Sequence, residues 1–365
     1  MASSKPEPQD VVPWLPPAAV TVVLLTLSIV VGLLSVECTS QPATTTAARP
    51  ALQLCAPMAT QPSDRFALVH GYITYTSGSG IWAVDPRHPD NRVSLGPSNG
   101  ETPIAWSRDG RRLLLRKQRN AGAAGGFKND LCVMNADASQ TQLTSDGLSA
   151  DGSFSPDGTK VVFSRQDDGL YVINAKGGTP RLIARSYSAW WLGSPAWSPD
   201  GSHIAYTVYQ ENGPEGLTYQ IWTVSPDGTG PHPLVDLGEC GPGCAGGLAW
   251  SPDGSMLAFH SALGSVQNGN PAWAIYVVHA DGSDIRRITD KLDQDGMPLE
   301  SSLWPIWSPD GSRIAFVRRD VFEGGGGQLY TATPDGSDVR PVEGVVMSPP
   351  YPAFALWSWN PVAGT

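Results

Sequence analysis

The chain has 365 residues, of which 40 are glycine, 33 are proline and only 16 % are charged, and its formal net charge is −10. This mixture favours a turn-rich all-β protein over a helical one, and a hydrophobic content of 41 % excludes a largely disordered chain. The acidic balance, without any run of Lys or Arg, argues against a nucleic-acid partner and indicates that charge keeps the protein soluble.

The N-terminal region predicts a membrane anchor. After a short tail, residues 1–17, the segment 18–36 ("AAVTVVLLTLSIVVGLLSV") is apolar and uncharged, and as a helix it would nearly cross a hydrocarbon core of about 30 Å. Lys5 precedes this segment and no cation follows it until Arg49, so we expect a cytoplasmic N-terminus and an exported remainder. The prediction is a single-pass protein of the cell membrane. A cleaved signal peptide, or a lipoprotein processed at Cys38, is the alternative.

The next segment, residues 37–65, is rich in Thr, Pro and Ala and has no sustained hydrophobic periodicity. Such a composition is typical of a flexible stalk. The globular part then spans residues 66–361.

Four kinds of short segment recur in this globular part, and each is found six times. An aromatic residue followed by Ser comes first, then an apolar strand such as "IAF" seven residues later, then a strand such as "IYVV", and last a polar residue leading an apolar pair. Runs this short, bounded by turn residues, are strands, and six four-stranded units predict a six-bladed β-propeller. The aromatic residues are Trp106, Phe154, Trp197, Trp250, Trp307 and Trp357.

The two ends of the repeat array are complementary. The first unit, which starts at Tyr72, lacks an opening strand, whereas the chain finishes with the opening strand at Trp357 and no strand after it. We therefore expect the C-terminal strand to pair with the N-terminal blade and close the ring, which would hide the exposed edges of an open array.

This repeat resembles the TolB-type (WD40-like) β-propeller repeat, whose hallmark is a W-S-P-D-G turn followed by an I-A-F strand and an I-Y/W-V strand. The resemblance covers about residues 66–361. It implies a protein–protein interaction or scaffold role in the cell envelope. TolB proteins also have an N-terminal α/β domain, and here the predicted stalk and anchor precede the blades.

The repeated aspartate of the W-S-P-D-G segments has a structural explanation. In Ser-Pro-Asp-Gly the Ser forms a local hydrogen bond, Pro presets φ, and Gly adopts the left-handed conformation that ends the turn. Five copies spread around a ring could not converge on one substrate, so we expect these residues to shape the hairpin between the first and second strands. The aromatic residue of the segment should fill the wedge between blades. The aspartates are Asp109, Asp157, Asp200, Asp253 and Asp310.

The connections between strands predict two unlike faces. The first–second and third–fourth hairpins are short and form what we call the short-turn face. The other connections, such as "RKQRNAGAAGGFKND" (residues 116–130), are long and irregular and form the long-loop face. Recognition usually resides in such loops, so we predict that this face binds an envelope or secreted protein through aromatic residues, which could alternatively cover the channel as a small core. They are Tyr187, Trp190, Trp191, Tyr209, Trp273, Trp304 and Tyr351.

Motifs of catalysis are missing from the sequence. It has no G-x-S-x-G, no H-E-x-x-H and no Cys/His spacing typical of zinc, so we predict no catalytic residues, no metal, no cofactor and no enzymatic activity. The alternative is a propeller enzyme, a lyase or glycan hydrolase, or a carbohydrate-binding protein, with its site at the channel mouth. A small-molecule or glycan ligand thus stays open as a partner.

The five cysteines suggest one crosslink. Cys240 and Cys244 in "CGPGC" can meet through a Gly-Pro turn, and a local disulfide would suit an exported protein. Cys132 replaces an aromatic residue within a strand, so we expect it to be a buried thiol that packs as a small apolar group.

Overall fold

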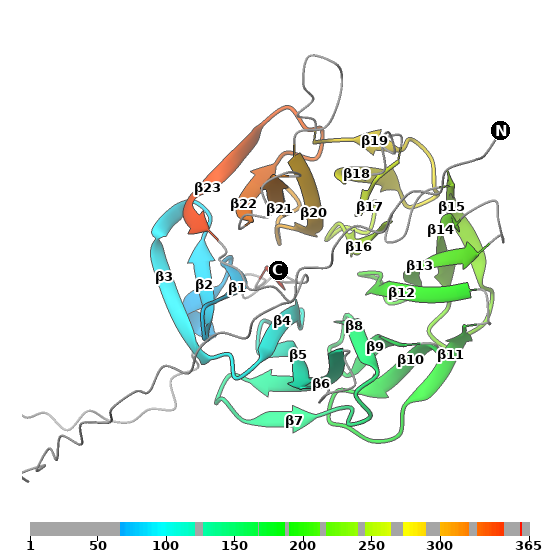
Figure 1. Cartoon of the computed structure of the whole chain (residues 1–365), viewed down its shortest axis with the longest axis horizontal. Coiled ribbons are helices and arrows are strands. Elements are labelled where there is room, and N and C mark those ends of the chain that lie inside the picture. The colour runs from blue at the N-terminus through cyan, green and yellow to red at the C-terminus, as the bar shows by residue number, and fades with distance from the viewer. Residues whose placement is uncertain are drawn as a thin grey trace, which may run out of the picture. The chain divides into compact units, whose positions relative to one another are not determined.

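Figure 1 shows the computed structural model of the chain, in which six β-sheets surround a central channel. The described residues form 24 strands and one short 3-10 helix, η1 (Ala67–Val69). They all lie within one compact unit of the chain, Ala59–Thr365. The described ranges are 66–120, 127–166, 168–186, 190–211, 217–239, 245–263, 273–289, 300–320, 327–346 and 358–359.

Each sheet has four antiparallel strands and forms one blade. Blade 1 consists of β24 (Ser358–Trp359), β1 (Ile73–Ser77), β2 (Gly80–Asp85) and β3 (His88–Pro97). Blade 2 consists of β4 (Glu101–Trp106), β5 (Arg112–Asn120), β6 (Phe127–Asn135) and β7 (Gln140–Gln142). Blade 3 consists of β8 (Ser149–Phe154), β9 (Lys160–Arg165), β10 (Gly169–Asn174) and β11 (Arg181–Arg185).

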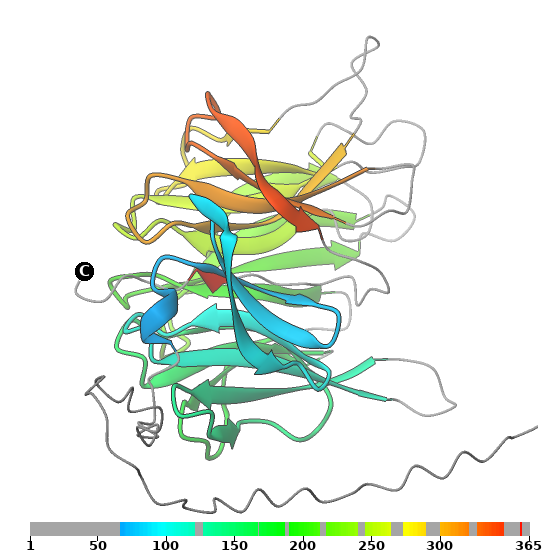
Figure 2. The same ribbon diagram turned by 90° about the vertical axis from the view of Figure 1, so that its left-hand side faces the viewer.

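The second half of the ring repeats this order, and the strands of each blade run between the two faces (Figure 2). Blade 4 consists of β12 (Trp190–Trp197), β13 (Ile204–Glu211), β14 (Leu217–Val224) and β15 (His232–Glu239). Blade 5 consists of β16 (Ala245–Trp250), β17 (Met256–Ser261), β18 (Ala274–His279) and β19 (Arg286–Arg287). Blade 6 consists of β20 (Glu300–Trp307), β21 (Ile314–Asp320), β22 (Gln328–Ala332) and β23 (Val339–Val346). The predicted all-β propeller with six four-stranded blades is confirmed.

Ring closure is also confirmed. Strand β24 pairs antiparallel with β1, and Ile73 lies opposite Trp359. The join is reinforced by packing, because Ile73 of blade 1 shares a buried apolar cluster with Leu303 and Val317 of blade 6. Trp357, which the sequence places in the closing strand, lies outside the described residues.

The hydrophobic core is divided among the spaces between blades. Six buried clusters are found, and each joins two neighbouring blades of the ring. Between blades 2 and 3, for example, Leu114 and Val133 meet Val161 and Ile173, and all four side chains are at most 1 % exposed. Burial of an aliphatic side chain contributes about 1.5–3 kcal/mol, so the blades are held together mainly by these interfaces.

In three blades, the tryptophan at the end of the inner strand, the first strand of the blade and the one that lines the channel, ties its blade to the preceding one, whereas the Trp197 indole bonds Gly201 O in its own turn (3.3 Å). Indole N–H groups that would otherwise be buried without a partner donate to the neighbouring blade, which satisfies the polar end of a large apolar side chain. These bonds run from Trp106 Nε1 to Thr74 Oγ1 (3.0 Å), from Trp250 Nε1 to Ala196 O (3.2 Å) and from Trp307 Nε1 to Ala249 O (3.0 Å).

No helix in the part of the chain that the structure describes is long and apolar enough to cross a membrane. The predicted tail, anchor and stalk (residues 1–65) lie outside that part. A membrane anchor therefore stays a prediction from the sequence.

Substitutions of Trp307 should separate the packing of this residue from its hydrogen bond. Trp307→Phe should lower the free energy of unfolding by about 1 kcal/mol, because Ala249 O loses its donor. Trp307→Ala should lower it by about 3–5 kcal/mol, because a buried cavity forms. Urea titration measures both values, with Leu68→Ala at a 71 % exposed position as the control. Equal losses for Phe and Ala would contradict packing as the main contribution.

Candidate functional site

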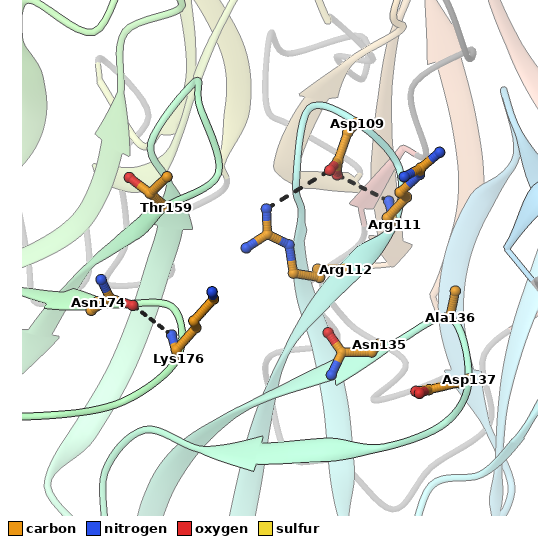
Figure 3. A pocket seen from close by; sticks show the side chains of 9 residues that line it. All are labelled: Asp109, Arg111, Arg112, Asn135, Ala136, Asp137, Thr159, Asn174 and Lys176. Atoms are coloured by element: carbon orange, nitrogen blue, oxygen red, sulfur yellow. Dashed lines mark hydrogen bonds and ion pairs between the residues drawn. The ribbon is translucent and has the colours of Figure 1, made fainter.

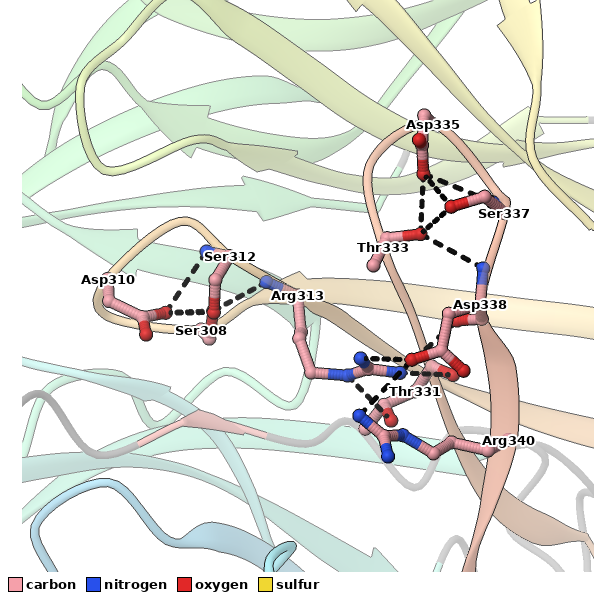
Figure 4. Close-up of polar contacts among 10 residues, drawn as sticks. All are labelled: Ser308, Asp310, Ser312, Arg313, Thr331, Thr333, Asp335, Ser337, Asp338 and Arg340. Carbon is pink, nitrogen blue, oxygen red and sulfur yellow. Dashed lines mark hydrogen bonds and ion pairs between the residues drawn. The ribbon is translucent and has the colours of Figure 1, made fainter.

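The Ser-Pro-Asp-Gly turns use their aspartates internally, as blade 6 illustrates in Figure 4. Ser308 Oγ donates to Asp310 Oδ1 (2.6 Å) and accepts from the Arg313 amide (2.9 Å). Asp310 Oδ1 also accepts from the Ser312 amide (3.0 Å), and Gly311 has a φ of 70°, where a side chain would be strained. The carboxylate is thus occupied by its own turn.

The same bonds recur in the other four turns, so the structure does not bring these aspartates together. Each carboxylate accepts from the Ser two residues before it, at 2.5–2.6 Å. At Asp200, the hydrogen bonds from Ser198 and Ser202 lower the pKa from the usual 3.8 to about 2. The four carboxylates are those of Asp109, Asp157, Asp200 and Asp253.

The inner strands share a second feature, a β-bulge that faces the channel. In β4, β8, β12, β16 and β20 the pairing with the next strand shifts register about three residues before the aromatic residue. Bulges re-aim side chains and are frequent next to functional sites. At least one residue from each bulge lines a cavity of about 70 Å³ inside the channel. We call this set, Ile104, Asp151, Ser194, Gly247 and Trp304, the bulge ring.

Three members of the bulge ring have left-handed backbones, with φ of 45° at Ser194, 61° at Gly247 and 53° at Trp304. For a residue with a side chain this costs about 1–3 kcal/mol and persists only where the surroundings enforce it. At Trp304 the enforcing contacts are visible, because its amide donates to His260 Nδ1 (3.3 Å) and the Arg319 guanidinium lies 5.6 Å from its ring centre.

The bulge ring is reached from the short-turn face. A larger cavity of about 570 Å³ shares Ile104, Pro195 and Leu248 with the cavity at the bulge ring, and it extends to the Ser-Pro-Asp-Gly turns. At that end Arg108 donates from Nη1 to Pro199 O (3.1 Å), two blades away. The channel is therefore a funnel that leads from the short-turn face to the bulge ring.

Asp151 is the carboxylate at the bottom of this funnel. Arg116, which is 5 % exposed, approaches from blade 2 and places Nη1 3.8 Å from Asp151 Oδ1. The Asp151 side chain is partly buried and keeps 30 % of its exposure. This burial raises the pKa of Asp151 above its usual value, although Arg116 and a hydrogen bond from Ser194 partly oppose the rise.

His260 lies close to Ser194, because a Cβ on Gly246 would be 3.2 Å from both Ser194 Oγ and His260 Nε2. Its pKa falls to about 3 because it is buried and because Arg319 is close. Since Nδ1 accepts from the Trp304 amide, the ring proton is on Nε2. A Cβ on Gly247 would lie 2.8 Å from Nδ1, so glycine permits this close approach. The Gly247 amide in turn donates to Ser194 Oγ (3.1 Å).

This cluster combines a guanidinium, a carboxyl group with a raised pKa, a hydroxyl and a neutral imidazole. Such groups can hold a carboxylate and move a proton, and perturbed carboxyl groups in clefts are typical of functional sites. Within the described ranges, no three His, Cys, Asp or Glu side chains are placed to hold a metal ion.

The predicted long-loop-face aromatics are only partly described, and that surface stays a prediction. Tyr209 stacks on Tyr219 at 5.4 Å, and Trp273 is half-buried against two core clusters. Trp304 is only 8 % exposed and belongs to the bulge ring. Tyr187, Tyr351 and the side chains of Trp190 and Trp191 lie outside the described residues.

The cysteine predictions are likewise described in part. Cys132 is a free thiol, 1 % exposed, and burial raises its pKa to about 12, which confirms the predicted apolar role. Cys240 and Cys244 lie outside the described residues, so their disulfide stays a prediction.

Arg116, Asp151, Ser194 and His260 were not among the residues predicted from the sequence. Alignment of the repeats on their aromatic residue carries the missing signal, because Asp151, Ser194, Gly247 and Trp304 then all stand three residues before it. A position that faces the channel and holds a different residue type in every blade is a candidate for function.

The fold and channel define the class of protein as a six-bladed β-propeller with an internal funnel. The family model for the TolB β-propeller domain matches residues 169–351, which is half of the chain. The chain belongs to this family, and the predicted resemblance is confirmed.

Several characterised and uncharacterised bacterial proteins are similar in sequence. An uncharacterized protein of Agrobacterium fabrum is 30 % identical over 59 % of this chain and 65 % of its own length. The Tol-Pal system protein TolB of Anaeromyxobacter dehalogenans is 31 % identical over 57 % of this chain and 42 % of its own length. Dipeptidyl-peptidase 5 of Porphyromonas endodontalis is 33 % identical over 27 % of this chain and 13 % of its own length. The chain thus spans less than two thirds of the length of these relatives.

Solved structures share the fold at low sequence identity. The tricorn protease superposes with a TM-score of 0.52 at 17 % identity, over 77 % of this chain and 27 % of that one. An oligogalacturonate lyase in complex with manganese gives a TM-score of 0.48 at 16 % identity, over 74 % of this chain and 71 % of that one.

The prediction that the chain is not an enzyme is wrong. A sequence relative of this propeller, 33 % identical over 27 % of the chain, is a dipeptidyl-peptidase. The prediction rested on the absence of local sequence motifs, but a propeller can assemble an active site from residues on separate blades.

Acid titration should reveal the role of the turn aspartates. The folded-state pKa of Asp200, about 2, is below its usual 3.8, so its stabilising effect is complete above about pH 4 and disappears as the pH falls towards 2. Asp200→Asn should flatten the decline of stability in this window. The change should stay under about 1 kcal/mol, because solvent screens the exposed carboxylate. Urea unfolding at a series of pH values measures it, and Asp236→Asn is the control. An unchanged slope would contradict the assignment.

Proposed function

We propose that the chain is a lyase that cleaves an acidic saccharide, with its site at the bulge ring. The observation that carries this proposal is Asp151, a carboxyl group with a raised pKa that lines the cavity at the bottom of an open funnel and has the buried Arg116 guanidinium 3.8 Å away. This proposal refines the alternative given in the sequence analysis, which is a propeller enzyme or carbohydrate-binding protein with its site in the channel.

Elimination from a uronic acid requires two functions that the cluster offers. The proton on the carbon beside the substrate carboxylate becomes acidic only when the carboxylate charge is neutralised, and the Arg116 guanidinium can supply that neutralisation. A base must then remove the proton, and Asp151 is suited because its raised pKa makes it a stronger base than an ordinary carboxylate.

The step is balanced with one catalytic carboxylate. Asp151 takes the proton from the carbon next to the carboxylate, and the C–H electron pair forms a C=C bond as the glycosidic C–O bond of the adjacent carbon breaks. The departing oxygen receives a proton, which the newly protonated Asp151 can return. No water is consumed, and the products are an unsaturated acidic sugar and a saccharide with a free hydroxyl.

Hydrolysis of the glycosidic bond is less well supported. That chemistry usually needs two carboxyl groups about 5–9.5 Å apart. Among the described residues that line the cavity at the bulge ring, Asp151 alone carries a carboxyl group.

Replacement of Asp151 tests the proposal. Asp151→Asn should reduce kcat on oligogalacturonate by about 10²–10⁴-fold, measured as the ultraviolet absorbance of the unsaturated product. The matched control is Asp146→Asn, because Asp146 also faces an arginine, at 3.0 Å from Arg165, and is 33 % exposed. Undiminished turnover in Asp151→Asn would refute the role. Binding of the oligosaccharide without turnover by the wild type would favour a carbohydrate-binding protein instead.

The pH profile gives a readout that a structural role would not change. Because Asp151 must be deprotonated to act as a base, kcat should rise with pH through its raised pKa. The Arg116 charge lowers the pKa of Asp151. Arg116→Gln removes this charge and should raise that pKa further, so the ascending limb of kcat should move to higher pH. A lower kcat with an unmoved limb would indicate that Arg116 only supports the fold.

Protein binding at the long-loop face is a second candidate function. It is supported by the 31 % identity to the Tol-Pal system protein TolB, and the partner would be an envelope or secreted protein. The uncharged segment 18–36 supports attachment to the cell membrane with the propeller on the extracytoplasmic side.

A reporter fusion tests this placement. Alkaline phosphatase fused after residue 365 should be active in a bacterial host, and the fusion protein should sediment with membranes. Deletion of residues 18–36 should abolish both properties, whereas deletion of the stalk residues 39–60 should preserve them. An inactive full-length fusion would contradict export.

A further inference from the structure

A second cavity, of about 650 Å³, lies on the short-turn face between blades 2 and 3 (Figure 3). Its walls are the β4–β5 and β6–β7 turns of blade 2 and the β8–β9 and β10–β11 turns of blade 3. We call it the blade 2–3 groove. It is lined by Asp109, Arg111, Arg112, Asn135, Ala136, Asp137, Thr159, Asn174 and Lys176.

Two cations in this groove break the repeat. Arg111 stands where the other Asp-Gly turns have a hydroxyl that bonds the turn aspartate, as Ser202 Oγ does to Asp200 at 2.7 Å. Lys176 stands where the third–fourth turns of blades 2, 4, 5 and 6 have an aspartate, such as Asp227, and where blade 1 has Arg87. The turn at Lys176 is complete without its ammonium group, because Asn174 Oδ1 accepts from the Lys176 amide (2.9 Å).

These two side chains remain available for a ligand. Both are exposed, and neither donates a side-chain hydrogen bond or ion pair to another residue that the structure describes. The third cation of the groove, Arg112, is held in place, 3.8 Å from Asp109 and 5.7 Å from the ring centre of Phe154.

The carboxylates of the groove are already occupied. Asp109 accepts from Ser107 Oγ (2.5 Å) and from the Arg111 amide (3.1 Å), and Asp137 accepts from the amide and hydroxyl of Ser139 (2.9 and 2.6 Å). Three cations therefore face two internally bonded carboxylates, in a chain whose net charge is −10. The groove is a local site of positive charge on an acidic protein.

We propose that the blade 2–3 groove binds a carboxylate-bearing sugar unit of the same acidic saccharide whose reacting unit lies at the bulge ring, an inference that rests on the proposed function. Arg111 and Lys176 would bind the carboxylate, and Asn135, Asn174 and Thr159 supply hydrogen-bonding groups for hydroxyls. None of the described residues that line the groove is aromatic, which favours a polar ligand.

The β4–β5 turn connects the two sites. Arg111 and Arg112 of this turn line the groove, whereas Arg108 of the same turn lines the channel funnel and reaches Pro199 O across its mouth. A saccharide that leaves the funnel beside Arg108 would thus pass the turn that supplies two cations of the groove, Arg111 and Arg112.

The test uses variants that restore the residues of the other blades, so that the turns are preserved. Binding of trigalacturonate is measured by calorimetry on the full chain carrying Asp151→Asn, which prevents turnover. Adding Arg111→Ser and Lys176→Asp should raise the Kd for trigalacturonate about tenfold or more and reduce the dependence of the Kd on salt. The control pair, Lys128→Ser and Arg185→Asp, changes the net charge equally at the other ends of the strands and should leave the Kd within about twofold.

The outcomes separate the groove from the catalytic proposal. An unchanged Kd in the groove variant overturns the groove, whatever Asp151→Asn does to turnover. If the groove variant has a higher Kd but the wild-type protein shows no turnover, the result supports saccharide binding in the groove and overturns the proposal that the protein is a lyase. Binding of neutral maltotriose with equal affinity overturns recognition of a carboxylate. Competition by inorganic phosphate at equal concentration would assign the groove to phosphate and overturn the assignment to a sugar acid.

Discussion

The contact between successive blades is the interaction on which this molecule depends. At each described junction an aromatic residue or its neighbours bridge to the preceding blade, and a buried apolar cluster fills the space behind it. The Ser-Pro-Asp-Gly turns add a second contact, because a Cβ on Gly201 would lie only 3.6 Å from Pro156 of the blade before. One short sequence segment therefore shapes a turn, fills a wedge and sets the spacing of the ring.

This arrangement explains where the candidate site lies. The aromatic residue fixes the end of each inner strand against the neighbouring blade. The bulge about three residues earlier is therefore held at a constant depth in the channel. Side chains from different blades then meet there although they are far apart in the sequence. Arg116 and Asp151 are such a pair, and burial around them raises the pKa of the carboxyl group.

The fold could be predicted from the sequence because each part of the blade repeat is specified by residue types that are close together in the chain. Turn residues, aromatic wedges and short apolar strands each have their own signature, and the complementary ends predicted the closure between β24 and β1. The site was missed because it has no local signature. Arg116 was assigned to a long loop, whereas β5 continues to Asn120, and Asp151 was an unremarked strand residue.

The bulge ring has one more implication. Its members are isoleucine, aspartate, serine, glycine and tryptophan, while the turns and wedges around them are nearly uniform. Chemistry and scaffold are thus encoded at separate positions of the same repeat. A mutation at a bulge alters what the channel presents without disturbing its supports, so propellers of this kind can diversify their specificity one blade at a time, and protein engineers could exploit the same freedom.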